Sequence, residues 1–157
     1  MNRPLSDYGT ILTYYGDDFT GSTDALEALA LNGIESVLFL DTPPEDALDR
    51  FPACRAVGLA GEGRSRTPEW MSRHLPAVFG RLKRLGAPIC QYKGCSTFDS
   101  SPETGNIGRA AEIGQEVFGA PYVPVVVAAP HLKRYVLFGN LFAASEGAIH
   151  RIDRHPV

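Results

Sequence analysis

The chain has 157 residues, of which 44% are hydrophobic and 21% are charged, and its formal net charge is −3. This length corresponds to about one domain, and the composition is ordinary for a globular protein that buries its own core. Charges of both signs are mixed along the chain, which argues against nucleic-acid binding, and no apolar run is long enough to cross a membrane. Three cysteines without a CxxC pair favour a reduced, cytoplasmic compartment, and the four scattered histidines show no metal-ligand spacing.

The first part of the chain alternates short apolar runs with helical patterns. An apolar run predicts a buried strand at Thr10–Tyr15, and Ser22–Asn32 follows with the periodicity of a helix. The second strand is expected at Ser36–Leu40. A short polar helix at Glu45–Arg50 and a third strand at Ala56–Ala60 come next.

The following helix has the clearest start signal in the chain. Thr67 can accept the N-cap hydrogen bond, and Pro68 suits the first helical position. Apolar residues then recur at a helical period up to Leu85, and Gly86 ends the helix. Pro76 lies inside this pattern and should kink or split the helix, because proline removes a backbone donor.

The rest of the chain contains longer elements first and shorter ones after them. Pro88–Tyr92 is expected to be the fourth strand, and Lys93–Gly105 a long loop. A helix capped by Asn106 should run to about Phe118, and a fifth strand is expected at Val123–Ala128. Short strands or hairpin pieces are expected beyond it, at Tyr135–Phe138, Leu141–Ala143 and Ala148–Ile152.

This alternation of strands and helices predicts an α/β fold, with a mostly parallel, Rossmann-like sheet and helices on both faces. In such sheets, ligands bind beyond the carboxyl ends of the strands. The unusual sequences of this chain nearly all follow expected strands, at Gly16–Thr23, Gly61–Arg66, Lys93–Gly108 and Gly139-Asn140. We therefore expect them to converge on one edge of the sheet.

Two adjacent carboxylates, Asp17 and Asp18, stand at the end of the first expected strand. Because neighbouring negative charges raise the cost of ionising both, one of them can titrate high enough to accept a proton near neutral pH. Thr20 and Gly21 follow at the start of a helix, where a hydroxyl and close backbone approach suit an anionic oxygen. The alternative is a capped turn in which both carboxylates bond backbone amides.

A glycine-rich loop, Gly61–Arg66, contains two arginines. Guanidinium groups present paired donors that suit a carboxylate, and Ser65 beside Arg66 adds a hydroxyl. The alternative is that Arg64 and Arg66 are solvated surface residues, as most arginines are.

The segment that begins at Lys93 combines a cation, hydroxyls and a carboxylate. Lys93, Ser96, Thr97 and Asp99 follow the fourth strand, and Asn106 heads the next helix. Donors for a carboxylate and acceptors for hydroxyls together suit a small hydroxylated acid. The alternative is a polar loop that only caps the helix.

In this order, the motifs resemble the N-terminal domain of the four-carbon acid sugar kinase family over essentially the whole chain. The resemblance rests on Asp17–Asp24, on the Ser65-Arg66 pair, on Lys93 with Ser96-Thr97, and on Gly105–Gly108. No single piece is specific, but the ordered set is.

The resemblance implies a two-domain kinase, of which residues 1–157 form a single sugar-acid-binding N-terminal domain. In such enzymes, the N-terminal half binds a sugar acid such as threonate or a 3-oxo acid. The C-terminal half, which is absent from this chain, binds ATP and Mg²⁺ and delivers phosphate to a hydroxyl. This chain has no Gly-x-x-x-x-Gly-Lys-Ser/Thr phosphate loop, so we expect no ATP turnover by the chain alone. A homodimer is compatible with the resemblance.

The resemblance also implies roles for the carboxylates and for the loop arginine. Asp17 and Asp18 would face the acceptor hydroxyl or the sugar hydroxyls, and one of the two would act as the base. Arg66, with Ser65, would bind the substrate carboxylate. Thr20 and Gly21 would contribute to the same substrate site, as would Asn106.

The third motif both matches the family and departs from it. Lys93, Ser96 and Thr97 would hold the substrate or the transferred phosphoryl group. Phe98–Thr104 replaces a short Leu-Arg sequence of the family, so the usual arginine is missing and Asp99 enters with a longer loop. This departure indicates a branch with a different substrate, such as kinases of the branched acid 3-oxo-isoapionate.

Two other classes of protein share parts of the pattern. A response-regulator receiver also has paired Asp residues after its first strand. However, it requires an Asp after its third strand, where this chain has Gly61-Glu62-Gly63-Arg64. A non-catalytic domain that binds a small hydroxy acid would use the same site without a kinase partner domain.

Overall fold

The computed structural model describes residues 9–44 and 46–156, and these form two compact units. Unit 1 comprises the described residues up to Cys95 together with Asp99–Tyr122. Unit 2 comprises Ser96–Phe98 and the described residues from Val123 onward. That residues 1–157 act as one sugar-acid-binding domain stays a prediction.

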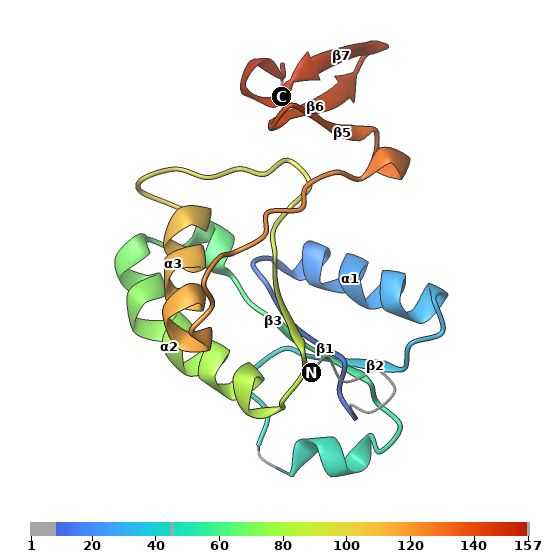
Figure 1. Cartoon of the computed structure of the whole chain (residues 1–157), viewed down its shortest axis with the longest axis vertical. Helices are drawn as coiled ribbons and strands as arrows, with labels where there is room; N and C mark the ends of the chain where they lie inside the picture. The colour runs from blue at the N-terminus through green and yellow to red at the C-terminus, as the bar shows by residue number, and fades with distance from the viewer. Residues whose placement is uncertain (1–8, 45, 157) are drawn as a thin grey trace. The chain divides into compact units, whose positions relative to one another are not determined.

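The core of unit 1 is a four-stranded sheet in which every pairing is parallel (Figure 1). Its spatial order is β2-β3-β1-β4. Gly16 pairs with Ala60 on one side and with Lys93 on the other, so three strands end at the same level. The strands are β1 (Leu12–Gly16), β2 (Ser36–Phe39), β3 (Ala56–Ala60) and β4 (Ile89–Lys93).

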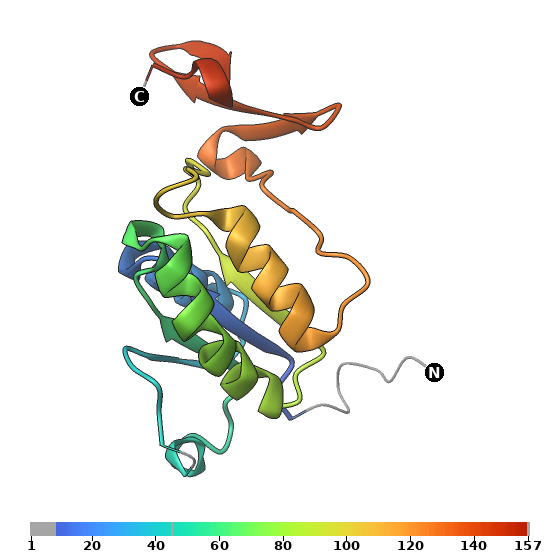
Figure 2. The same ribbon diagram turned by 90° about the vertical axis from the view of Figure 1, so that its left-hand side faces the viewer.

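Helices cover both faces of this sheet. Helix α1 (Phe19–Leu31) packs on one face, whereas α2 (Pro68–Arg84) and α3 (Ile107–Phe118) pack against each other on the opposite face (Figures 1 and 2). The predicted α/β fold, with a parallel sheet and helices on both faces, is confirmed.

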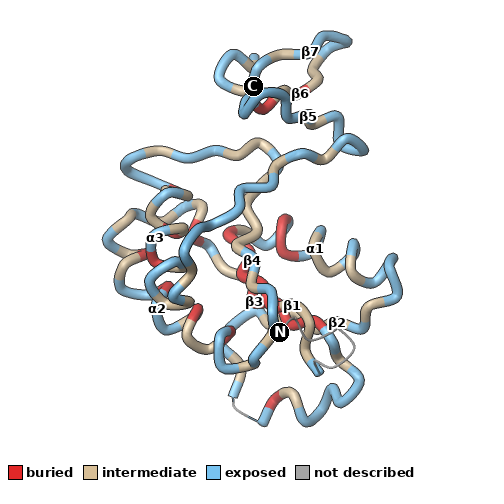
Figure 3. The backbone as a smooth tube through the Cα atoms, in the orientation of Figure 1, coloured by how far each residue is buried: buried red, intermediate tan, exposed pale blue. Residues whose placement is uncertain are grey.

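Strand β1 places one tyrosine on each face of the sheet, because successive side chains of a strand point in opposite directions. Each ring lies over a glycine that follows or belongs to β3: Tyr14 over Gly58 and Tyr15 over Gly61. Both tyrosines are almost fully buried, and buried backbone concentrates along β1 and β3 (Figure 3). The core on the α2 and α3 side consists of Tyr15, Leu59, Met71, Leu75, Phe79, Leu82, Ala110 and Ile113.

Several boundaries differ from the sequence-based expectations. Helix α1 begins at Phe19 rather than Ser22, because the Asp18 side chain caps it. Helix α2 is continuous through Pro76, which is exposed, so the expected split is wrong. The expected loop after β3 contains a short 3-10 helix, η3 (Gly63–Ser65). The expected polar helix is a 3-10 helix, η2 (Ala47–Arg50), and Glu45 lies outside the described residues.

The predicted fifth strand at Val123–Ala128 is wrong. This segment forms no strand, and Ala129 makes only an isolated bridge to Arg134. Pro124 offers no backbone N–H for a ladder, and Pro121 and Pro130 flank the segment, which explains why an apolar run fails to pair here.

Unit 2 is built around a three-stranded antiparallel sheet of order β5-β6-β7. Two-residue turns at Phe138-Gly139 and Glu146-Gly147 join the strands, and all four turn residues have positive φ, as type I′ hairpins require. The expected hairpin pieces are confirmed. However, Gly139-Asn140 follows a strand of this second sheet rather than one of the parallel sheet. The elements are η4 (Pro130–Leu132), β5 (Arg134–Leu137), β6 (Asn140–Ser145), β7 (Ala148–Arg151) and η5 (Ile152–Arg154).

The contact between Tyr14 and Gly58 leads to a first prediction. A Cβ added at Gly58 would lie 2.1 Å from the Tyr14 ring, and this ring is fully buried in the core. We therefore expect Gly58→Ala to destabilise the fold by about 2 kcal/mol, measured by denaturant unfolding. Gly80→Ala in α2 is the matched control: a Cβ there meets nothing closer than 3.9 Å, so stability should hold or rise. Equal effects of both substitutions would contradict this packing.

Candidate functional site

The carboxyl edge of the parallel sheet gathers charged residues from three strands. Asp17 and Asp18 follow β1, Arg64 lies in the loop after β3, and Lys93 ends β4. Backbone hydrogen bonds hold these segments together, from Asp17 N to Lys93 O at 3.0 Å and from Arg64 N to Asp17 O at 3.0 Å. In unit 1, therefore, the acidic pair, the arginine loop and the lysine lie together, as predicted.

Asp18 is held by two partners on opposite sides. Its Oδ1 accepts a hydrogen bond from the backbone N–H of Gly21 and caps α1, and its Oδ2 lies 3.0 Å from Arg64 Nη1. The other guanidinium nitrogen of Arg64 lies 2.6 Å from Asp99 Oδ2. Arg64 therefore bridges two carboxylates and joins the loop after β4 to the start of α1.

Asp17 has the opposite environment. The residue is only 2% exposed, and within the described part of the chain its Oδ1 has no hydrogen-bond partner. Burial, and then the charge of Asp18, raise the pKa of Asp17 from 3.8 to about 6, although Arg64 and Lys93 pull in the other direction. Asp17 therefore changes its protonation state within about one unit of neutral pH.

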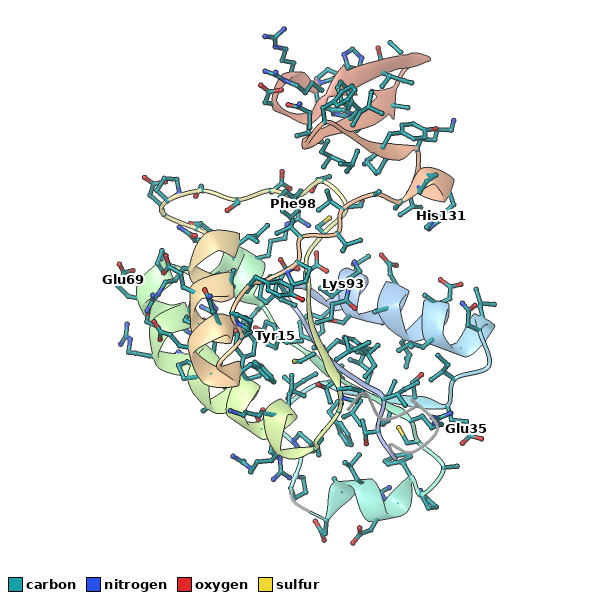
Figure 4. All side chains as sticks on the ribbon, viewed as in Figure 1. Tyr15, Glu35, Glu69, Lys93, Phe98 and His131 are labelled. Atoms are coloured by element: carbon teal, nitrogen blue, oxygen red, sulfur yellow. The ribbon has the colours of Figure 1, made fainter. Side chains whose placement is uncertain are left out.

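Lys93 lies beside the first turn of α1 (Figure 4). Its Nζ donates to the carbonyl of Gly94 at 2.9 Å. A Cβ at Gly21 would lie 3.4 Å from this Nζ and 2.8 Å from Asp18 Oδ1, so only glycine lets the lysine and the cap come this close. An ammonium group and a helix N-terminus thus face the same point, an arrangement that suits an anionic oxygen.

The predicted carboxylate-binding pair has other contacts in this structure. Arg66 forms an ion pair with Glu62 and lies 5.4 Å from the centre of the Trp70 ring. Ser65 Oγ donates to the carbonyl of Glu62. Their role toward a substrate stays a prediction, because both side chains are partly exposed and surface contacts of this kind are weak.

The other predicted binding residues are spread over both units. Thr20 is exposed on the first turn of α1, and Asn106 caps α3 through a 2.8 Å bond from Arg109 N to its Oδ1. Ser96 and Thr97 belong to unit 2, whereas Asp99 belongs to unit 1. Their roles in binding also stay predictions.

Arg64 is the residue that sequence reasoning left out of the candidate site. Its presence in the glycine-rich loop was visible, but two arginines occur there, one residue apart. Only the conformation of η3 decides that Arg64 faces Asp18 while Arg66 contacts Glu62. Local sequence carries no signal for that choice.

The raised pKa of Asp17 leads to a second prediction. Since the folded state binds this proton more tightly than the unfolded chain, stability falls as the pH rises from about 4 to about 6. Asp17→Asn removes that cost, so we expect its Tm at pH 8 to exceed that of the parent by roughly 5 °C, with little gain at pH 4. Thermal unfolding at both pH values measures the effect.

Asp24→Asn is the control for this experiment, because Asp24 is an exposed carboxylate on α1. It should show no comparable pH-dependent gain. A Tm for Asp17→Asn that falls equally at pH 8 and pH 4 would mean that Asp17 is a structural residue with an ordinary carboxylate.

The chain is similar to known proteins over nearly all of its length. A family model described as a sugar-binding N-terminal domain matches residues 12–157. A 3-oxo-isoapionate kinase of Paraburkholderia graminis is 56% identical over 94% of this chain and 32% of its own length. Two 3-oxo-tetronate kinases, from Brucella melitensis and Salmonella typhimurium, are 34% and 32% identical; each alignment covers 90% of this chain, and 31% and 33% of the respective relative.

A solved structure, described as a putative tRNA synthase, has a similar fold. A chain from Salmonella typhimurium LT2 superposes with a TM-score of 0.79 at 29% identity, over 94% of this chain and 34% of that chain. The present chain thus spans about a third of the length of the relatives that it matches. Because the family model matches nearly the whole chain, the chain belongs to the sugar-binding N-terminal domain family of the four-carbon acid sugar kinases.

Proposed function

We propose that this chain is the sugar-acid-binding part of an ATP-dependent kinase that phosphorylates a small sugar acid on a hydroxyl group. The observation that carries the proposal is the division between two adjacent carboxylates. Asp18 is tied to Arg64 and to the helix cap, whereas Asp17 is buried with a pKa of about 6. Neighbouring carboxyls with different environments are the usual basis for separate roles in acid–base chemistry.

In this proposal, Asp17 is the proton acceptor. A general base works best when its pKa lies near the working pH, and that of Asp17 does. Asp18 stays in place as the cap of α1 and holds Arg64. The acceptor hydroxyl of the sugar acid would lose its proton to Asp17 as the phosphoryl group arrives.

Anionic groups would be bound by the cations of the same edge. Lys93 makes a neutral contact with the Gly94 carbonyl, so its charge can serve a substrate carboxylate or the transferred phosphoryl group. Arg66 with Ser65 remains the second candidate for the carboxylate. Within unit 1, Thr20 would contact a hydroxyl group of the substrate, whereas the roles of Ser96 and Thr97, which belong to unit 2, stay predictions.

The substrate we propose is a branched 3-oxo sugar acid of the 3-oxo-isoapionate type, with four-carbon 3-oxo acids as the second candidate class. Identity is 56% to a 3-oxo-isoapionate kinase and 34% or 32% to two 3-oxo-tetronate kinases. The loop after β4, which the resemblance implies is longer than usual for the family, brings Asp99 Oδ2 to 2.6 Å from Arg64 Nη2 and so reaches the candidate site itself. A change of loop at this point suits a change of substrate.

The nucleotide and its metal ion belong elsewhere in this proposal. Among residues 9–44 and 46–156, no group of three His, Cys, Asp or Glu side chains lies together in a way that could hold a metal ion. We place ATP and Mg²⁺ on a further domain of the complete kinase, and expect no turnover by this chain alone. A homodimer stays a prediction.

We also propose that the complete enzyme is cytoplasmic. Cys54, Cys90 and Cys95 are free thiols, which suits a reducing compartment. No helix in the described part of the chain could span a membrane.

Calorimetric titration of the chain with 3-oxo-isoapionate and 3-oxo-tetronate tests the binding step. We expect the branched acid to bind more tightly, and Lys93→Met to weaken its binding about tenfold or more, because a charge-assisted contact is lost. Lys83→Met is the matched control, since Lys83 lies on α2 and donates to Val117 O. If neither acid binds, the proposed function is wrong.

Catalysis is tested by joining this chain to the C-terminal two thirds of the Paraburkholderia graminis relative. In that fusion, Asp17→Asn should lower kcat about a hundredfold or more and leave sugar-acid affinity within a few fold. Binding without phosphate transfer by the parent fusion would favour a non-catalytic hydroxy-acid-binding domain.

A further inference from the structure

Three polar atoms are buried beside the candidate site, and among the described residues none of them makes a hydrogen bond of regular geometry, although the backbone N–H groups of Gly63 and Glu62 lie near Tyr15 Oη. They are Tyr15 Oη, Tyr92 Oη and Asp17 Oδ1. Buried polar groups are nearly always paired with protein or with ordered water. A cluster of three calls for a shared explanation.

The strand register places all three side chains on one face of the sheet. Tyr15 and Tyr92 are direct neighbours on the parallel strands β1 and β4. Asp17 follows Tyr15 by two residues, and its N–H continues the ladder to Lys93 O at 3.0 Å. Since side chains two apart in a strand point the same way, Asp17 points toward the α2 and α3 side with both tyrosines.

Gly63 shows how close the two hydroxyls are. The position that a Cβ on Gly63 would take lies 3.1 Å from Tyr92 Oη and 3.5 Å from Tyr15 Oη. Both hydroxyls therefore border the same small region beside the backbone of Gly63. Burial raises the pKa of both phenols; the nearby charge of Asp17 raises it further, whereas the backbone N–H groups of Gly63 and Glu62 lower the pKa of Tyr15.

The rings that carry these hydroxyls are fixed by packing. Tyr15 and Tyr92 lie 5.8 Å apart between ring centres, and each meets Phe79 edge-on, at 6.0 and 6.5 Å. Tyr15 lies between the sheet and helices α2 and α3, away from solvent (Figure 4). The hydroxyls therefore cannot turn outward to find other partners.

We propose that one buried water molecule joins the hydroxyls of Tyr15 and Tyr92 to the inner oxygen of Asp17, and that the two tyrosines are positioning residues for this carboxyl. A phenol hydroxyl can donate to an ionised carboxylate and accept from a protonated one. The pair thus holds Asp17 in one orientation before and after it takes up a proton. The catalytic meaning of this network rests on the proposed function; the network itself does not.

The other charged groups that act on Asp17 come from three segments and are only half-buried. They are Asp18 at the start of α1, Arg64 from the loop after β3, and Lys93 at the end of β4. Glu62 acts on Tyr15 from the same loop. None of these changes in a Tyr→Phe substitution, so such variants isolate the hydroxyl contribution.

Thermal unfolding of Tyr92→Phe in the 157-residue chain tests the network. If the hydroxyl serves ionised Asp17, its removal should lower Tm by about 3 °C at pH 8 and by clearly less at pH 5, where Asp17 is protonated. In an Asp17→Asn background, the difference between the two pH values should vanish. Tyr15→Phe should behave in the same way.

Tyr14→Phe is the matched control on the opposite face, where Tyr14 Oη donates to Ser22 O at 3.2 Å. Its effect should be the same at both pH values. A Tm for Tyr92→Phe that stays level or rises at pH 8 would overturn the proposal, because removal of an orphan buried hydroxyl relieves a cost.

Carbon NMR of the Asp17 carboxyl gives a second readout. Loss of a donor to the ionised form should raise its pKa by about one unit in Tyr92→Phe, and an unchanged titration would equally overturn the network. Neither experiment uses a sugar acid. A chain that shows the pH signature but binds no sugar acid would thus refute the proposed function alone.

Discussion

The in-register ends of three parallel strands are the constraint on which the candidate site depends. Gly16, Ala60 and Lys93 lie side by side, and backbone bonds continue the ladder beyond them, from Gly61 N to Gly16 O at 2.9 Å and from Asp17 N to Lys93 O at 3.0 Å. Three segments far apart in the chain therefore leave the sheet at one place. The chemistry follows from main-chain geometry before any side chain is considered.

The pleat of β1 then separates two neighbouring carboxylates. Asp17 continues on the face that carries α2 and α3 and becomes buried, whereas Asp18 turns to the other side and caps α1. One residue of offset thus decides which carboxyl pairs with Arg64 and which is desolvated. No further structural feature is needed for this division, because successive side chains point to opposite faces in every strand.

Sequence periodicity predicted the fold class and the convergence of the acidic pair, the arginine loop and Lys93, because both follow from parallel strand direction. Periodicity did not predict features of the structure that depend on single prolines or capping side chains. Pro124 outweighed the apolar run at Val123–Ala128, and the capping carboxylate of Asp18 moved the start of α1. It also gave no means of choosing Arg64 over Arg66, since that choice depends on the turn of η3 in three dimensions.

The contact of Tyr14 with Gly58 and of Tyr15 with Gly61 also has an evolutionary consequence. Each ring occupies the space where the glycine on or after the neighbouring strand would carry a side chain. A relative can therefore enlarge position 58 or 61 only if it shrinks position 14 or 15 at the same time. These two pairs of positions should covary across the family, and the covariation would reflect the space that each ring occupies rather than any role in function.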